Sequence, residues 1–184
     1  MTGAGLLLAL ASAALALLGL GMTGHMAAHM LAVCVAAPAV ALGLPRAAVP
    51  GGPFAMMVLE LATVWGWHLP ALRDAADMSV ALTLMEQACF LLVGIALWRA
   101  SLADPARGVA ALLLTSMHMT LLGALIALAS RPLYAGMAMH TPPNLDALTD
   151  QQLGGTVMLA LGGASYLAGG LWLMAGLLRR RVTA

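Results

Sequence analysis

The stretch Gly24-His25-Met26-Ala27-Ala28-His29-Met30 opens an apolar run that extends to Leu44. Its two His-Met pairs are four residues apart, and on a helix such positions lie on one face, about one turn apart. We therefore expect the imidazoles of His25 and His29 side by side. Three methionines repeat this spacing on the adjoining face and a cysteine continues it one turn deeper: Met22, Met26, Met30 and Cys34.

Imidazole, thioether and thiolate groups together form a ligand set that favours copper, particularly Cu(I), over magnesium or calcium. The alternative interpretation needs no metal. Methionines also fill apolar interfaces, and the histidines would then lie where the helix meets the lipid headgroups.

The composition of the chain predicts an integral membrane protein. Of the 184 residues, 62% are hydrophobic and 8% are charged, and the mean hydropathy is +0.98. Apolar runs of about 20 residues match the length that a bilayer span requires. The net charge of +1 argues against a nucleic-acid partner, which would need a basic patch. The two cysteines, Cys34 and Cys89, each fall inside an apolar run, so they do not resemble a secreted disulfide framework.

Six apolar segments predict an all-α, polytopic transmembrane bundle that forms a single domain over residues 1–184. The predicted spans are Gly3–Gly21, His25–Leu44, Phe54–Leu69, Ser79–Trp98, Val109–Ala129 and Gly154–Leu178. The first segment lacks a preceding basic region and is longer than the apolar part of a signal peptide, so we interpret it as a span. The short connection Met22-Thr23-Gly24 makes the first two spans an antiparallel hairpin, and only residues 130–153 form a long loop.

The arginines orient this bundle. With a cytoplasmic N-terminus, six arginines lie inside and only Arg73 and Arg131 lie outside, as the positive-inside rule requires. The six inside are Arg46, Arg99, Arg107, Arg179, Arg180 and Arg181. We therefore predict that both termini are cytoplasmic and that the protein lies in a bacterial inner membrane. Four of the five histidines then map to the outer half of the protein, and His118 joins them only if the fifth span is turned inward.

Several further residues are candidates for chemistry. Glu86 lies inside a span, where ionisable groups are functional candidates by default. It could orient a ligating histidine or accept a proton that metal binding displaces, or it could be a protonated glutamate that fixes helix packing. His68 follows two tryptophans and is either a ligand at the depth of His25 or a member of the interfacial aromatic belt. A buried His118 needs a partner, which favours a metal, although its flanking methionines point away from its own face.

The outer loop contains Met137-Ala138-Met139-His140, whose soft ligands suit either a metal-acquisition site or a plain surface loop. Cysteines are more often packing residues than ligands, although Cys34 lies on the methionine stripe. The candidates for a secondary metal site, or for a group that supports the ligands, are Met22, Cys34, Glu86, Cys89, His140 and Asp150.

Six short motifs occur in an order known from one protein family. They are His-Met-x-x-His-Met at 25–30, Ala37-Pro38 with Gly43-Leu44-Pro45, Trp67-His68-Leu69-Pro70-Ala71-Leu72, Met117-His118 with Leu122-Gly123-Ala124, Arg131-Pro132-Leu133-Tyr134, and Asp150-Gln151-Gln152-Leu153-Gly154-Gly155. From Gly24 to the last span, the chain resembles the cytochrome c oxidase assembly factors of the CtaG type. These are polytopic membrane proteins linked to copper delivery during assembly of heme-copper oxidases.

The resemblance implies a metal-handling set and a structural or gating role for Asp150 and Gln151. The implied set is His25, Met26, His29, Met30, His68 and His118. Where the family carries His-x-x-Glu-His, this chain has Thr83, Glu86 and Gln87, and it has fewer predicted spans than is common in the family. Such a member could bind copper more weakly, use Met78, Met85 or Cys89 instead, or serve as a scaffold.

Three functions remain open from the sequence. The leading hypothesis is a non-enzymatic assembly factor that holds Cu(I) near the outer face and passes it on by ligand exchange. Its partners would be a heme-copper oxidase subunit or a periplasmic copper chaperone, in the lipid bilayer, with a homo-oligomer also compatible. The second hypothesis is a non-catalytic scaffold subunit. The third is a b-type cytochrome with axial histidines on two helices, a role that His25 and His29 cannot fill together because they share one helix face.

Overall fold

The structure, a computed structural model, describes residues 2–182 and is helical throughout its regular elements. In chain order these are α1 (Thr2–Ala16), α2 (Gly21–Met30), the π-helical η1 (Leu31–Ala36), α3 (Ala37–Gly43), α4 (Gly52–Trp67), α5 (Pro70–Asp77), α6 (Val80–Ala103), α7 (Pro105–Ala127), α8 (Ala135–Ala138), α9 (Ala147–Val157), the π-helical η2 (Met158–Gly162) and α10 (Gly163–Val182). The all-α prediction is confirmed.

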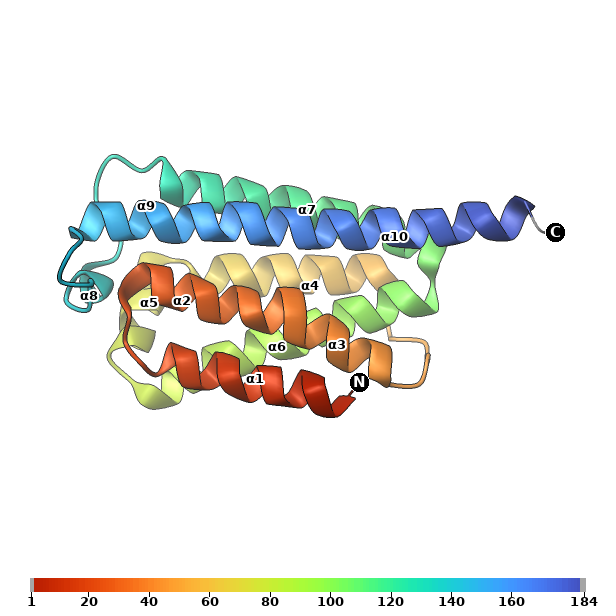
Figure 1. Ribbon diagram of the computed structural model, residues 1–184, viewed down its shortest axis with the longest axis horizontal. Coiled ribbons are helices and arrows are strands. Elements are labelled where there is room, and N and C mark those ends of the chain that lie inside the picture. Colours follow the sequence, from red (N-terminus) through yellow and green to blue (C-terminus); the bar gives the residue numbers. More distant parts are fainter. Residues whose placement is uncertain (1, 183–184) are drawn as a thin grey trace.

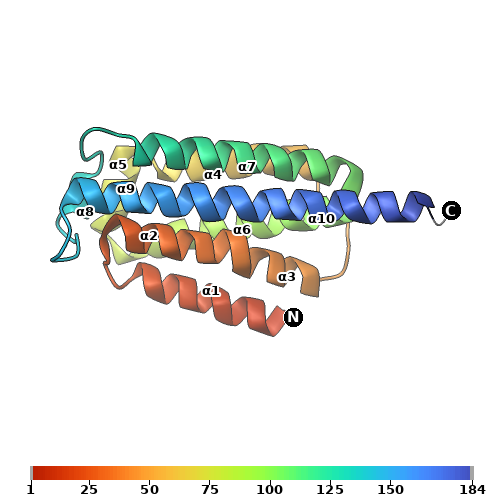
Figure 2. The same cartoon turned by 45° about the horizontal axis from the view of Figure 1, so that its top comes forward.

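The long helices lie side by side along the length of the molecule (Figure 1). The segments α9, η2 and α10 form one continuous rod beside α7, and α1 runs antiparallel to α2 (Figures 1 and 2). The chain near both termini points toward one end of the bundle, whereas α5 and α8 lie at the other end. Arg46, Arg179 and Arg180 line one cavity, so arginines that were predicted on one side of the membrane do gather together. Which side faces the cytoplasm stays a prediction.

Four helical segments are long and apolar enough to cross a membrane: Gly21–Gly43, Val80–Ala103, Pro105–Ala127 and Ala147–Arg180. A fifth results if α4 and α5, which meet at a bend of 69°, are counted as one broken span. The predicted first span, Gly3–Gly21, is not confirmed as a crossing. Its helix has 15 residues, which at about 1.5 Å each reach about 22 Å, less than the roughly 30 Å of hydrocarbon.

Two predicted boundaries are wrong at the site's end of the bundle. Met22, Thr23 and Gly24, predicted as a connection, form the first turn of α2, and the connection consists of residues 17–20. The last long helix starts at Ala147, so it already includes residues assigned to the 130–153 loop. It starts there because Asp146 accepts hydrogen bonds from the backbone N–H groups of Leu148 and Thr149, at 3.0 and 2.9 Å.

Small residues let the helices approach closely around the core. A Cβ added to Gly123 of α7 would lie 2.6 Å from the backbone nitrogen of Leu159, and one added to Gly155 would lie 2.5 Å from that of Ala127. The backbones of α7 and of the α9–η2 rod are therefore in direct contact, as is common between membrane helices. Methionines fill much of the fully buried core: Met22, Met26, Met30, Met119 and Met158.

Candidate metal centre

Three histidines from two helices meet in the interior near one end of the bundle. His25 and His29 come from α2, and His68 follows the last residue of α4. One ring nitrogen from each lies within 4.8 Å of the others. The exposed fractions of the three residues are 6%, 0% and 4%. The spacing of four residues on α2 does place two imidazoles together, and the structure adds His68 to them, with its ring centroid 5.5 Å from that of His25 and 5.4 Å from that of His29.

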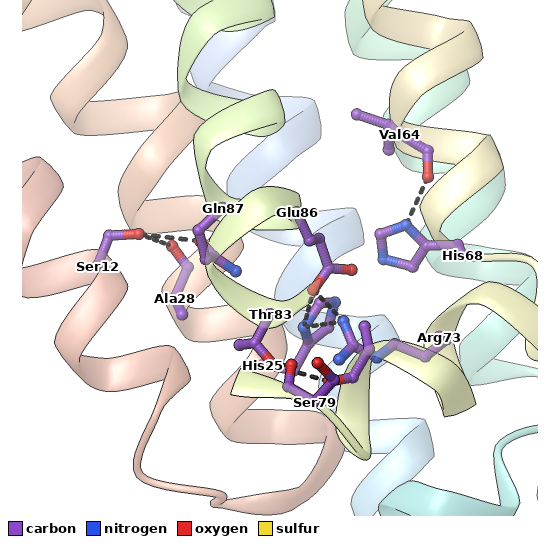
Figure 3. A network of polar contacts seen from close by, with 11 residues as sticks. Ser12, His25, Ala28, Val64, His68, Arg73, Ser79, Thr83, Glu86 and Gln87 are labelled. Carbon is purple, nitrogen blue, oxygen red and sulfur yellow. Dashed lines mark hydrogen bonds and ion pairs between the residues drawn. The ribbon is translucent and has the colours of Figure 1, made fainter. Parts of the chain in front are cut away.

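The end of α4 positions His68 and fixes its tautomer. Pro70 has no N–H and begins α5, so the helix axis turns at this point. The His68 Nδ1–H donates to the carbonyl of Val64 at 2.7 Å (Figure 3). A carbonyl only accepts, so Nδ1 carries the proton and Nε2 keeps a lone pair. The buried Nε2 has no hydrogen-bond partner, which leaves it available as a metal ligand.

Tyr134, in the loop that follows α7, stabilises the bend between α4 and α5. Its hydroxyl donates to the backbone carbonyl of His68 at 3.0 Å. Burial raises the pKa of Tyr134 to about 12, so the hydroxyl keeps its proton at any physiological pH. The loop motif that contains Tyr134 therefore stabilises the turn that presents His68.

A buried ion pair lies directly beside His25. The short helix α5 carries Arg73 inward, where its guanidinium pairs with Glu86 of α6 (Figure 3). Arg73 Nη1 also lies 3.0 Å from Nδ1 of His25, and Glu86 Oε2 lies 3.8 Å from the same nitrogen. Glu86 thus lies next to a candidate ligand, as one of the sequence interpretations required. The sequence placed Arg73 in an outer loop, and its burial was not predicted. The only signal for it was Pro70, which turns the chain back toward the bundle.

The three imidazoles contain polar atoms that the protein leaves unsatisfied. The buried nitrogens without a hydrogen-bond partner are His25 Nε2, His29 Nδ1, His29 Nε2 and His68 Nε2. Each such group costs about 1–3 kcal/mol, and native proteins contain few of them. Phe90 stacks on His29, with ring centroids 3.9 Å apart, and so restricts the orientation of that ring. A cluster of buried, oriented and unpartnered nitrogens has the chemistry of a transition-metal site.

The sulfur groups extend along α2 below the histidines. Met26 and Met30 are fully buried, and the Cys34 Sγ lies 3.8 Å from the Met30 Sδ. Cys34 belongs to the π-helical η1, and its thiol also lies 3.7 Å from the carbonyl of Leu161 in η2. Of the predicted stripe, Met22, Met26 and Met30 are therefore in the buried core, and Cys34 is partly buried at its end. π-Helical segments are rare and are frequently found at functional sites.

Other predicted candidates lie outside the histidine group. Among the described residues, His118 of α7 belongs to no such group, although it is buried and both its ring nitrogens lack partners. Cys89 is a free, half-buried thiol on α6. His140 lies on the surface, and its Nδ1 is 3.1 Å from a carboxylate oxygen of Asp77.

Asp150 and Gln151 are used by the backbone of neighbouring segments. The two carboxylate oxygens of Asp150 accept from the N–H groups of Met22 at 2.7 Å and Thr23 at 3.2 Å, which caps α2 from another helix. The Gln151 side chain accepts from Leu133 N at 2.6 Å and donates to the carbonyls of Ile126 in α7 and Arg131 in the loop, both at 3.3 Å. These contacts correspond to the structural role that the resemblance implied.

A narrow cavity reaches the site from the end where α8 lies. Its volume is about 20 Å³, roughly that of a single water. The lining includes His25 and Arg73 at the site, with Asp77 and Met137 nearer the loops. Of the three histidines, only His25 contributes to the lining.

The fold and this centre define a class: a polytopic helical membrane protein with a buried group of three histidines that could hold a metal ion. The family model described as cytochrome c oxidase caa3 assembly factor matches residues 1–180, so the chain belongs to that family. Neither a curated protein nor a solved structure matches the chain.

The two residues that depart from the family's histidine pattern face other partners. The Thr83 hydroxyl donates to the carbonyls of Ala76 and Ser79. The Gln87 Oε1 accepts from the hydroxyl of Ser12 on α1 (Figure 3). Neither side chain is part of the three-histidine group, although Thr83 lines the small cavity beside His25 and the buried Gln87 Nε2 has no hydrogen-bond partner.

Proposed function

We propose that this protein is a copper-handling assembly factor that holds Cu(I) at His25, His29 and His68 and passes it to a heme-copper oxidase. The observation that carries the proposal is a group of three buried histidines, each with one ring nitrogen within 4.8 Å of the others and each with a buried ring nitrogen that has no hydrogen-bond partner. Family membership supplies the link to oxidase assembly. Three imidazoles also suit zinc, and the preference for the softer Cu(I) rests on the buried thioethers of Met26 and Met30 on the same helix as His25 and His29.

The arrangement suits release as well as binding. Cu(I) is the cargo here, and it would move by exchange between closely placed imidazole and thioether ligands, with no bond made or broken in a substrate. The small cavity beside His25, with Met137 and Asp77 in its lining, marks where a route would open to a partner at that end of the bundle. With the predicted orientation, this end faces the periplasm of a bacterial inner membrane, and the role is non-catalytic.

The test is the metal content and affinity of the detergent-purified full-length protein under anaerobic conditions. We expect one Cu(I) per chain, held more tightly than Zn(II), as measured by competition with a chromogenic chelator. The double variant His25→Ala with His29→Ala should lose this copper. The matched control is His140→Ala, which removes a histidine outside the group and should retain it. An unchanged copper stoichiometry in the double variant would refute the assignment.

The scaffold hypothesis is favoured by one observation. The positions at which the resemblance implies further histidines hold Thr83 and Gln87, which are weaker metal ligands and hydrogen-bond to Ala76 and Ser12. A scaffold would co-purify with a large membrane complex and bind no Cu(I) in the competition assay. A b-type cytochrome is disfavoured because the cavity at the site, about 20 Å³, is far smaller than the several hundred cubic ångströms, roughly 300–1,000, of sites that hold organic cofactors.

A further inference from the structure

Arg73 is a permanent cation buried among the groups that would hold the metal. It is 1% exposed and pairs with Glu86 inside the bundle. Its Nη1 lies 3.0 Å from the Nδ1 of His25. A positive charge at this distance from a candidate ligand opposes the binding of a metal cation. Its location therefore needs an explanation beyond the pairing of one glutamate.

The contact with Arg73 determines the protonation of His25. A guanidinium has donors and no acceptor, so the Nδ1 of His25 must accept and carries no proton. An imidazolium, protonated on both nitrogens, is excluded at this contact. A neutral imidazole with a bare Nδ1 carries its proton on Nε2. His25 thus has no free lone pair: Arg73 occupies the one on Nδ1, and a proton occupies Nε2.

The other two histidines differ from His25 in this respect. The Nε2 of His68 has a lone pair because its Nδ1–H donates to Val64. His29 has no hydrogen-bond partner on either nitrogen, so its neutral ring offers one lone pair in either tautomer. The metal-free centre therefore presents two ready ligands and one that is withheld.

We propose that Arg73 is a built-in competitor of the metal for His25 and that it sets how tightly the centre holds Cu(I). This proposal rests on the metal-handling function above. To coordinate the metal through Nε2, the His25 ring must change its tautomer. The proton on Nε2 is lost and a proton is gained on Nδ1, so the ring stays neutral. Arg73 then gives up its bond to Nδ1 and keeps its pair with Glu86. Glu86 Oε2, 3.8 Å from Nδ1, is placed to accept the new N–H, a carboxylate–histidine arrangement common at metal sites.

This competition suits a protein that must give up its cargo. When the metal leaves, the guanidinium returns to Nδ1 of His25, and Glu86 stays paired with Arg73 throughout. The bend at Pro70 is what allows one residue of α5 to contact both α2 and α6. Arg73 is a positioning residue, because it acts on the metal through His25.

The first test needs no metal and no substitution of the pair. Nitrogen-15 NMR of histidine-labelled, metal-free protein should show His25 with a bare Nδ1 and a protonated Nε2, with the resonances assigned by the loss of signal in His25→Gln. Addition of Cu(I) should reverse the pattern to a protonated Nδ1. Metal-free His25 with a protonated Nδ1 would overturn the proposal, whether or not the protein binds copper. If the tautomer is as expected but no Cu(I) binds, the proposed function fails and the contact between Arg73 and His25 stands.

The second test measures Cu(I) affinity in Arg73→Gln by chelator competition. We expect at least tenfold tighter binding than in the unmodified protein, because the competing donor and its charge are gone. Glu86→Gln should bind at least tenfold more weakly, because it removes the negative charge that offsets Arg73 and leaves only a neutral amide oxygen as the acceptor for Nδ1–H. Arg131→Gln, at an exposed arginine in the loop, is the control and should leave the affinity unchanged. Equal or weaker binding in folded Arg73→Gln overturns the proposal, and if that variant does not fold, the NMR experiment decides.

Discussion

Asp150 provides the sharpest test of how distant elements build the metal centre. It lies 128 residues from Met22 along the chain, yet its carboxylate accepts the N–H groups of Met22 and Thr23. These are donors that a helix cannot satisfy internally, and α2 has no side-chain cap of its own. The next turn of α2 carries His25. Replacement of Asp150 by Ala therefore removes a cap from the helix that presents two of the three ligands.

The expected loss follows from these contacts. Loss of a helix cap costs about 0.5–2 kcal/mol, and hydrogen bonds to a charged group are worth about 1.5–3 kcal/mol each, without full additivity. We therefore expect about 2–4 kcal/mol of lost stability for Asp150→Ala, which for a chain of this size corresponds to a Tm lower by about 4–16 °C. Asp150→Asn keeps an acceptor oxygen without the charge and should lose about half as much.

Tryptophan fluorescence during thermal unfolding in detergent measures this effect, and chelator competition on the same samples measures the Cu(I) affinity. Asp104→Ala is the matched control, because Asp104 caps α7 in the usual local manner, accepting from Arg107 N at 3.2 Å, and is half-exposed. It should lower the Tm by only a few degrees, about 2–4 °C for about 1 kcal/mol, and leave the affinity unchanged. A Tm of Asp150→Ala within about 2 °C of the unmodified protein would refute the role of this carboxylate as the cap of α2.

Three further predictions concern the surroundings of the site. Tyr134→Phe loses the hydrogen bond to the His68 carbonyl and should cost about 1 kcal/mol of stability. The resulting decrease in Tm should be the same from pH 5 to 9, because the pKa of Tyr134 is about 12. A decrease that changes with pH would contradict this. Hydrogen bonds from the Thr149 backbone and hydroxyl lower the pKa of Asp146. The stabilisation by Asp146 is therefore present above its unfolded pKa of about 3.9 and is lost as the pH falls through the lower folded pKa. Asp146→Ala should abolish this part of the acid-induced decrease in Tm, and parallel plots of Tm against pH for the two proteins would refute the prediction. Gly123→Ala would place a Cβ 2.6 Å from a backbone nitrogen of η2 and should lower the stability of the fold by about 1–3 kcal/mol. The control Gly66→Ala, where a Cβ would meet open space, should not lower it. Equal Tm values for the two variants would contradict the close packing of α7.

The helical content and the pairing of His25 with His29 were accessible from the sequence because both depend on local periodicity. Apolar runs define the long helices, and a spacing of four residues places two side chains on one face whatever the rest of the fold does. The start of the last helix was missed because the apolar pattern begins after Gly154, whereas the helix begins where Asp146 satisfies its first N–H groups. In this chain, the capping residue and the start of the apolar pattern therefore indicate different starting positions for the last helix.

The sequence by itself determined the membrane class, the resemblance to one family and the residues from which a soft-metal site could be built. Only the tertiary structure decided which of them meet: His68 joins His25 and His29, while His118 does not. It also placed Arg73, which in the sequence belongs to a polar turn, inside the bundle. The physical reason is that a charged side chain can be buried only next to a group of opposite charge. For Arg73 that group is Glu86, which lies on another helix whose position no local pattern encodes.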